Sequence, residues 1–505
     1  MKRYHLYILC FIFIQQSVTS QSLYQRDWGT LLSVYKTRVV PFTASEDKLI
    51  RPPYLITEVN SKTEKLYVVG ADGNDIYEFD FENAIPKLIF KIPDGKTGGS
   101  YIEQIKQDHD GNLIISGRTT NEFLATPGAY SQNMIYGMSL RVTFISKISL
   151  SGHLLWSTYF HDLTPNTSHL TIDAANNIYF LNKRNKATIA HPSHFQATGN
   201  SFSSIEYQDV ISKLNSEGEH IWSTFYTKDA STIRSIVAGD TGLYVYGDHL
   251  GGASESSYFG TPNSFQPKLS TYESDSNNLT SVFLTKFSFE GERMWSTYFS
   301  NHSSSITLGA TLKNNNSMVV INDEPYILTT HRRGPYSDKV LVTEGAYLSD
   351  PKKTFTNTTL SKFSSDGDRI WTTFIEAGEH VFSNGKELFV STSLFNASIK
   401  NEKLITTKNA YQEFHGGNRQ DAYTTIYSLD GKQLKYASFY GYDGRDEGVT
   451  LPTATGYYVI GKSNFNTSSE SLFVTDHAPR VEYIEYNGNY LGDFLSYFKR
   501  KKESN

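Results

Sequence analysis

Five tryptophans in a chain of 505 residues share one short phrase, and this recurrence limits the possible folds more than any other feature. Trp is followed by Ser, Gly or Thr and then by Thr at Trp28, Trp156, Trp222, Trp295 and Trp371. Weaker copies, with Phe or Tyr in place of Trp, lie at Phe90, Tyr436 and Phe494. Successive copies are 58 to 76 residues apart. The chain is therefore a series of similar repeats rather than a set of unrelated domains.

Each interval contains the same phrases in the same order. A phrase rich in β-branched and aromatic residues comes first, as in LYVVG at 66–70 and LYVYG at 243–247, and this composition is typical of strands. A second phrase alternates apolar and polar residues on both sides of a turn such as Glu217-Gly218 or Asp366-Gly367, which indicates a hairpin. No stretch has a sustained 3.6-residue apolar period, so we expect little helix.

A repeat with four strand phrases predicts one blade of a β-propeller. We expect an all-β fold, a seven-bladed β-propeller with four-stranded blades, over residues 21–498. The recurrent Trp is interpreted as a structural wedge between adjacent blades, because a ring of sheets must bury a large apolar side chain at each junction. Eight anchors for seven blades leave one strand over, so we expect the N-terminal strand around Trp28 to join the last blade and close the ring with the C-terminal strand.

The first 20 residues have the pattern of a secretory signal peptide. A basic start at Lys2-Arg3 precedes an apolar run over 6–14, and small or β-branched residues precede a cleavage site near Ser20. The run is too short to span a bilayer, which takes about 20 residues. Cleavage removes Cys10, the only cysteine; a lipid-modified Cys10 is the alternative interpretation. We expect a secreted or cell-surface protein with a solvated basic tail over 499–505.

The composition excludes several functional classes. A net charge of −5 and a pI near 6.3 provide no electrostatic footprint for nucleic acid. One cysteine excludes a disulfide scaffold and any CxxC zinc or redox site. No segment after the leader is long and apolar enough to be transmembrane. We expect a monomer without cofactor or metal.

Several phrases match a known repeat: Asp110-Gly111-Asn112, Gly117-Arg118-Thr119, Thr126-Pro127-Gly128-Ala129-Tyr130 and Trp156-Ser157-Thr158-Tyr159. They resemble the SBBP repeats, which are seven-bladed β-propeller repeats of exported bacterial proteins. The resemblance covers essentially the whole mature chain, although the first interval is degenerate. It implies the propeller fold, and it implies no activity because that family has no common catalytic motif.

A second resemblance concerns the turn before the Trp. The Gly-Glu-x-x-Trp pattern at 218–222 and 291–295 is similar to a docking motif of quinoprotein-like propellers, which usually have eight blades. Seven intervals and the Thr-Pro-Gly-Ala-Tyr loop favour the first family.

The long connections between the second and third strands, such as 118–143 and 248–281, are expected on one face of the ring. Loops of this length usually carry function. An aromatic residue recurs within them, at Tyr130, Phe195, Phe265, Tyr347 and Tyr411. A ligand-stacking platform is one interpretation; because the position is repeated, we favour an anchor that holds each loop against its blade.

Residues that occur in a single copy are better candidates for binding. They form three clusters: His331, Arg332 and Arg333; His415, Arg419 and Asp421; and Asp443, Arg445, Asp446 and Glu447. Three carboxylates in the last cluster could bind a hard cation, but a solvated turn with an Arg–carboxylate pair explains them more simply. The sequence lacks GxSxG, HExxH, a P-loop and a helix-opening GxGxxG, so we assign no catalytic residue.

We therefore expect an extracellular binding or interaction module that holds a glycan, a protein or a surface partner on its long-loop face. The alternatives are a glycan-active lyase or hydrolase with a site at the channel mouth, and a quinoprotein-like envelope assembly scaffold. The sequence leaves catalysis undecided and favours its absence. A cluster of His, Arg, Glu or Tyr at the channel mouth would favour an enzyme, and an apolar lining with varied loops would favour binding.

Overall fold

The computed structural model describes most of the strand-forming sequence. The described residues are 22–35, 57–60, 63–70, 73–80, 82, 85–93, 99–134, 141–160, 169–185, 195–197, 207–226, 230–251, 257–268, 279–299, 304–305, 316–331, 342–349, 358–395, 406–417, 419–442, 444–465 and 490–501. The expected signal peptide and its Cys10 lie outside them.

Over these residues the secondary structure is entirely β, as predicted, and contains no helix. The first four sheets along the chain each contain four antiparallel strands. They are β2 (Thr57–Val59), β3 (Leu66–Val69), β4 (Asp75–Phe79) and β5 (Lys87–Lys91); β6 (Tyr101–Gln107), β7 (Leu113–Thr119), β8 (Val142–Ile148) and β9 (Leu154–Phe160); β10 (Leu170–Ile172), β11 (Ile178–Asn185), β12 (Tyr207–Leu214) and β13 (His220–Phe225); and β14 (Ala230–Ala238), β15 (Leu243–Gly251), β16 (Leu279–Phe287) and β17 (Arg293–Tyr298).

The remaining strands form a five-stranded and an eight-stranded sheet. The former contains β18 (Ser304–Ser305), β19 (Met318–Ile321), β20 (Glu324–His331), β21 (Thr358–Phe363) and β22 (Arg369–Ile375). The latter contains β23 (His380–Ser383), β24 (Glu387–Phe395), β25 (Gln420–Ser428), β26 (Leu434–Tyr440), β27 (Arg445–Pro452), β28 (Gly456–Phe465), β29 (Tyr490–Arg500) and β1 (Tyr24–Tyr35). Two antiparallel groups of four strands make up this sheet, and a single parallel pair, Gln420 with Arg445, joins them.

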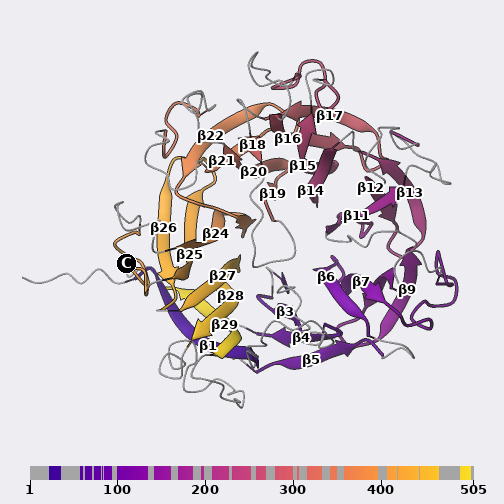
Figure 1. Ribbon diagram of the computed structural model, residues 1–505, viewed down its shortest axis with the longest axis horizontal. Helices are drawn as coiled ribbons and strands as arrows, with labels where there is room; N and C mark the ends of the chain where they lie inside the picture. The colour runs from indigo at the N-terminus through magenta and orange to yellow at the C-terminus, as the bar shows by residue number, and fades with distance from the viewer. Residues whose placement is uncertain are drawn as a thin grey trace, which may run out of the picture.

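Figure 1 shows the sheets following one another around a common centre, with strands such as β6, β14, β19 and β27 on the inner side of their groups. This order matches the repeat order of the sequence. The short turns, such as that from β6 to β7, lie at one end of the inner strands, and the long connections leave from the other end. The inner strands therefore have a short-turn end and a long-loop end.

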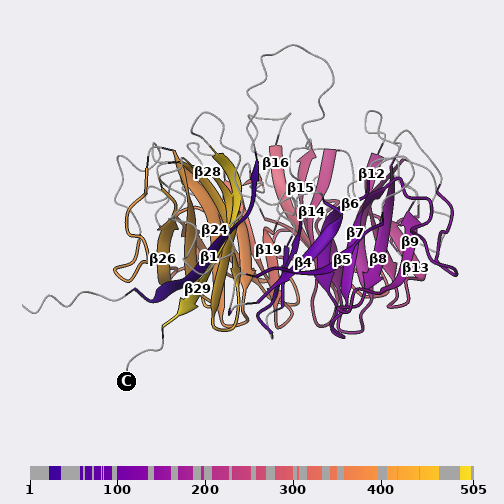
Figure 2. The same ribbon diagram turned by 90° about the horizontal axis from the view of Figure 1, so that it is seen from below.

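The two chain ends meet in one group, as predicted. Strand β1 pairs antiparallel with β29 and takes the outermost place beside it, and Figure 2 shows the two strands together at one side of the molecule. Phe494 therefore lies in a third strand, and its assignment as an eighth anchor is wrong, because β1 provides the fourth strand of this group. Strand β29 also extends through Arg500, which pairs with Glu387 at 3.1 Å, so the first two residues of the expected tail belong to the sheet.

The other anchors do occupy equivalent places. Each lies in the outermost strand of its group, directly after a one-residue bulge. They are Trp28, Phe90, Trp156, Trp222, Trp295, Trp371 and Tyr436. The extra residue of the bulge is exposed before each of the four tryptophans from Trp156 to Trp371, at Leu155, Ile221, Met294 and Ile370. The equivalent residue before Phe90, Ile89, is buried.

The Trp side chains join neighbouring groups. Trp156 donates its Nε1 hydrogen to the backbone oxygen of Ser216 at 3.0 Å, and Trp222 donates to Phe289 at 3.1 Å. Each acceptor lies in the hairpin turn of the following group. In that turn Gly218 lies so close to the Trp156 ring that an added Cβ would be 2.8 Å from it. The contacts confirm the wedge interpretation for these side chains.

The turn glycine offers a matched test of this contact. Gly218 and Gly385 both have positive φ, +84° and +82°, but a Cβ at Gly385 would meet nothing within 4 Å. We expect Gly385→Ala to cost about 1 kcal/mol of backbone strain. Gly218→Ala should cost about 1–3 kcal/mol more, because its methyl group overpacks the indole. Urea unfolding of both variants measures the difference, and equal losses would show that the indole contact contributes nothing.

The recurrent loop aromatics act as anchors. Tyr130 stacks on Phe160 with ring centroids 5.2 Å apart, and Tyr411 packs edge-on against Phe498 at 5.1 Å. Beside the first of these, the Thr126 amide donates to the Ser157 oxygen at 2.9 Å, so the loop covers part of the open edge of the outermost strand. This geometry supports the anchor interpretation rather than a stacking platform.

Candidate functional site

The inner strands of all the groups line one cavity of about 320 Å³. Its walls come from β2, β6, β10, β14, β19, β23 and β27. One part of the wall is polar and includes Glu58, Lys106 and His169, and the rest is mostly apolar. The lining lies in the middle of the inner strands and toward their short-turn end, since Lys106 is two residues from the turn that begins at Asp108.

A second feature lies at the long-loop end of the inner strands. We define the charged crown as three ion pairs: Glu103 with Arg118, Arg234 with Asp248, and Glu447 with Arg445. Glu103 and Arg234 are each the extra residue of a bulge in the innermost strand of their group. The same local geometry thus holds a carboxylate in one group and a guanidinium in another.

Each pair of the charged crown places the guanidinium farther into solvent than the carboxylate. Arg118 donates from Nε to Glu103 at 2.8 Å, Arg234 from Nε to Asp248 at 2.7 Å, and Arg445 from Nε to Glu447 at 2.7 Å. Arg445 also donates to the side chain of Gln420 at 3.2 Å. These hydrogen bonds fix the orientation of each guanidinium and leave some of its N–H donors facing the solvent.

Glu379 lies at the same level, directly before the innermost strand β23. Burial, followed by the nearby charge of Glu447, raises the pKa of Glu379 to about 7, and a hydrogen bond from Thr392 opposes the shift. A carboxyl group with this pKa can exchange protons near neutral pH. At the level of the charged crown, Glu379 therefore has the pKa of a general acid or base.

Two of the predicted clusters come together. Asp421 lies 3.6 Å from Nδ1 of His415, and both side chains are buried. The Gly416 amide donates to Asp421 at 2.6 Å, which holds the 412–417 segment against β25. Gln420, which precedes Asp421, accepts a hydrogen bond from Arg445. The His415–Asp421 pair therefore lies beside the ion pair of Arg445 with Glu447. The residues therefore meet where the two halves of the eight-stranded sheet join.

Other predicted residues do not join this site. His331 is buried in β20, forms a hydrogen bond with the Thr359 hydroxyl at 2.9 Å, and has a pKa lowered to about 4 by burial. His331 is therefore a neutral core residue near pH 7 and adds no charge to the cluster predicted at 331–333. The Asp446 side chain is also buried and accepts a hydrogen bond from the Tyr442 amide at 2.6 Å, so its role is structural. Arg419 is exposed. Arg332, Arg333 and Asp443 lie outside the described residues.

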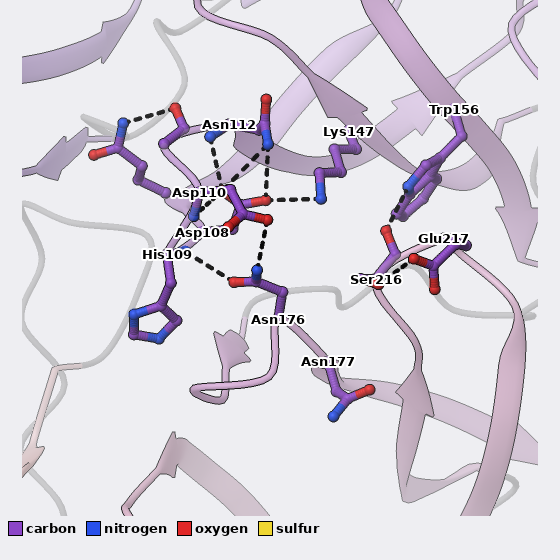
Figure 3. A network of polar contacts seen from close by, with 12 residues as sticks. Asp108, His109, Asp110, Asn112, Lys147, Trp156, Asn176, Asn177, Ser216 and Glu217 are labelled. Atoms are coloured by element: carbon purple, nitrogen blue, oxygen red, sulfur yellow. Dashed lines mark hydrogen bonds and ion pairs between the residues drawn. The ribbon is translucent and has the colours of Figure 1, made fainter.

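No group of three potential metal-ligating side chains occurs among the residues that the structure describes. The turn at 108–112 shows why its acidic residues need no cation (Figure 3). Asp108 accepts the Asn112 amide at 2.7 Å and pairs with Lys147 at 2.8 Å, while Asp110 accepts from Asn176 of the next group at 2.8 Å. The turn is a junction between two neighbouring groups.

Sequence reasoning did not identify Glu103, Arg118, Arg234, Asp248 or Glu379. Glu103 and Arg234 lie at equivalent places because a bulge in the inner strand aligns them, and their residue types differ from one group to the other. Aligning the repeats on the Gly within the second strand, Gly117 in β7 and Gly247 in β15, would have placed Arg118 and Asp248 at equivalent positions.

Asp421 makes stability depend on pH. Burial raises its pKa to about 7 in the folded chain, against about 3.9 when unfolded. The folded state therefore loses stability as pH rises from about 4 through 7, by an amount on the order of 4 kcal/mol. We expect Asp421→Asn to remove much of this loss in urea unfolding between pH 4 and 8, leaving the smaller contribution of Glu379. If the free energy of unfolding of the variant fell with pH as steeply as that of the parent protein, Asp421 would not be the group responsible.

No helix among the described residues is long and apolar enough to cross a membrane.

No family model and no curated protein matches the chain. Among solved structures, the polysaccharide lyase Uly1 is 9% identical with a TM-score of 0.43, and the match covers 96% of this chain and 98% of that one. A puromycin-hydrolysing peptidase of Mycobacterium tuberculosis is 9% identical with a TM-score of 0.39, covering 85% of this chain and 52% of that one. A gluconolactonase of Xanthomonas campestris is 10% identical with a TM-score of 0.30, covering 73% and 84%. The chain spans about half the length of the peptidase.

Proposed function

We propose that this chain is an exported, seven-bladed β-propeller of the SBBP-repeat type that works as a binding module outside the cytoplasm. Seven equivalent anchors and seven inner strands around one cavity support the blade number. The pairing of β1 with β29 supports closure of the ring through the chain ends. The leader-like first 20 residues support export.

The charged crown is the observation that carries the proposed function. Three guanidinium groups in three different groups of strands are held in fixed directions at the end from which the long loops leave. Preorganised donors bind with a smaller entropy cost than free side chains do. A cluster of Glu and Arg at this end was expected to favour an enzyme, but each crown carboxylate accepts a hydrogen bond from an Arg, which suits recognition better than proton transfer. The partner is a glycan, a protein or a surface component, held at the long-loop end.

The test is a glycan and protein-partner array probed with the mature protein and its variants. Arg234→Ala should weaken binding of the captured partner by about tenfold or more, since a hydrogen bond to a charged group contributes about 1.5–3 kcal/mol. Lys435→Ala is the matched control, because Lys435 pairs with Glu387 at 3.0 Å in an outermost strand, away from the crown. Absence of any partner, together with turnover of a polysaccharide, would exclude the binding module.

One observation favours a second candidate, a glycan-active lyase or hydrolase. Glu379 has a pKa of about 7 and lies close enough to Glu447 to feel its charge, and paired carboxyl groups serve as acid and base in such enzymes. If the protein degrades a polysaccharide, Glu379→Gln should abolish turnover. At about pH 4, where the Glu379 carboxyl is protonated in the folded and largely in the unfolded chain, the variant should leave the unfolding midpoint nearly unchanged. Retained turnover in this variant would exclude Glu379 as the catalytic group.

A further inference from the structure

We infer that the central cavity binds a small neutral ligand rich in hydroxyl groups, of the class of mono- and disaccharides. This site differs from the charged crown in place and in chemistry, because it lies toward the short-turn end of the inner strands. It requires no partner at the long-loop end, so it goes beyond the proposed function and can be tested separately.

One level of the inner strands forms a wall with two sides. At this level every inner strand places a residue opposite the second residue of the LYVVG-type phrase of the following strand, as Lys106 lies opposite Ile114 and Phe382 opposite Phe389. The equivalent residues, in chain order, are Glu58, Lys106, Thr171, Val237, Val319, Phe382 and Leu451. All of them line the cavity. The first three are polar and the last four are apolar.

Neighbouring inner strands contact one another in chain order, from β2 with β6 and β6 with β10 to β19 with β23 and β23 with β27. The polar residues therefore occupy three consecutive groups, and the apolar residues occupy the four groups that follow them around the centre, an order of strands seen in Figure 1. A ligand that fills this space therefore meets hydrogen-bonding groups along one edge and hydrocarbon along the other. A sugar ring has this combination, with hydroxyl groups at its rim and C–H groups on its faces.

The charges favour a ligand without net charge. Three titratable residues line the cavity: Glu58, Lys106 and His169. Glu58 and Lys106 form an ion pair at 2.7 Å and compensate each other. Burial, followed by the charge of Arg234, lowers the pKa of His169 to about 3, so its ring is neutral at pH 7. Neither an anion nor a cation would therefore meet a net opposite charge on this wall.

The ion pair also presents a hydrogen-bond acceptor beside a donor. The Glu58 carboxylate can accept from one hydroxyl group while the Lys106 ammonium donates to its neighbour, which matches two adjacent hydroxyl groups of a sugar. On the opposite side Phe382 and Leu451 can cover the C–H face. The volume of about 320 Å³ is close to the lower limit of small-molecule sites, about 300–1,000 Å³.

The test measures sugar binding by ligand-observed NMR and calorimetry on the full mature protein. The probes are glucose, galactose, mannose and lactose, with glucuronate and glucosamine as charged analogues. We expect at least one neutral sugar to bind, and both charged analogues to bind more weakly than it. Lys106→Met should weaken that binding by about tenfold or more. Lys65→Met is the matched control, because Lys65 has similar exposure, 39% against 36%, and pairs with Glu78 at 2.9 Å outside the cavity lining.

A second variant, Val237→Phe, fills part of the cavity from its apolar side and should abolish sugar binding. Circular dichroism and thermal unfolding show which variants remain folded. Failure of every neutral sugar to bind the parent protein would overturn the inference. Tighter binding of glucuronate, or an equal loss in Lys65→Met, would also overturn it. Arg234→Ala should keep the sugar affinity of the parent protein and lose the partner captured on the glycan and protein-partner array. The two measurements therefore distinguish a failure of the sugar site from a failure of the proposed function.

Discussion

Trp222→Ala is expected to lower the free energy of unfolding by about 3–5 kcal/mol. The Trp222 side chain is 1% exposed and packs between its own group and the next, near Tyr179 and with its Nε1 hydrogen bonded to the Phe289 backbone. Truncation leaves a cavity at this junction that a rigid sheet cannot close locally. It also removes one of the two donors to the Phe289 carbonyl, the other being Nζ of Lys213 at 3.0 Å. Guanidinium unfolding followed by circular dichroism measures the loss.

The neighbouring residue provides the control. Ile221 is the extra residue of the bulge in the same strand and is 44% exposed, so Ile221→Ala should change stability by no more than about 0.5 kcal/mol. A wedge role requires a large difference between the two variants. If both variants unfolded at the same denaturant concentration, the junctions would not depend on the indole.

Removal of residues 21–35 is expected to abolish cooperative folding of the mature chain. Strand β1 pairs with β29 along its length, from Tyr24 with Arg500 to Tyr35 with Leu491. Tyr24 is buried between Tyr436 and Tyr457, at centroid distances of 4.8 and 4.9 Å. Without β1 the edge of β29 is open, and an open edge favours association between chains. Size-exclusion chromatography and thermal unfolding should show aggregation or loss of the transition.

The control for this truncation lacks only residues 1–20 and should behave as the intact folded protein. The smaller change Tyr24→Ala tests the same joint without exposing the edge, and it should cost about 3–5 kcal/mol. A 36–505 chain that folds with the transition of the control would show that β1 is dispensable.

The recurrence of the Trp phrase was enough to predict the strand content, the order of the groups and the role of the indoles. Local physics decides these features, because a hairpin turn, a bulge and an apolar wedge each depend on a few adjacent residues. The strand position of Phe494 could not be predicted in this way. Its apolar alternation suits a third or a fourth strand equally well, and only pairing with the distant β1 decides between them.

The candidate site was predicted less completely, for a similar reason. Asp421 and His415 are close in sequence, and their proximity was predictable. Burial of His331 was not, because its exposure depends on the residues that neighbouring strands place over it.

By itself, the sequence determined a repeating all-β chain whose N-terminal strand pairs with the last group, since repeats of one phrase carry the same local preferences. Only the tertiary structure decided which unlike residues share a level around the centre. Glu103 and Arg234 are 131 positions apart in the chain and of opposite charge, yet equivalent bulges place both in the charged crown. Glu58 and Lys106 meet in the cavity because neighbouring inner strands bring them within 2.7 Å. A site formed by residues that do not repeat has no period to reveal it.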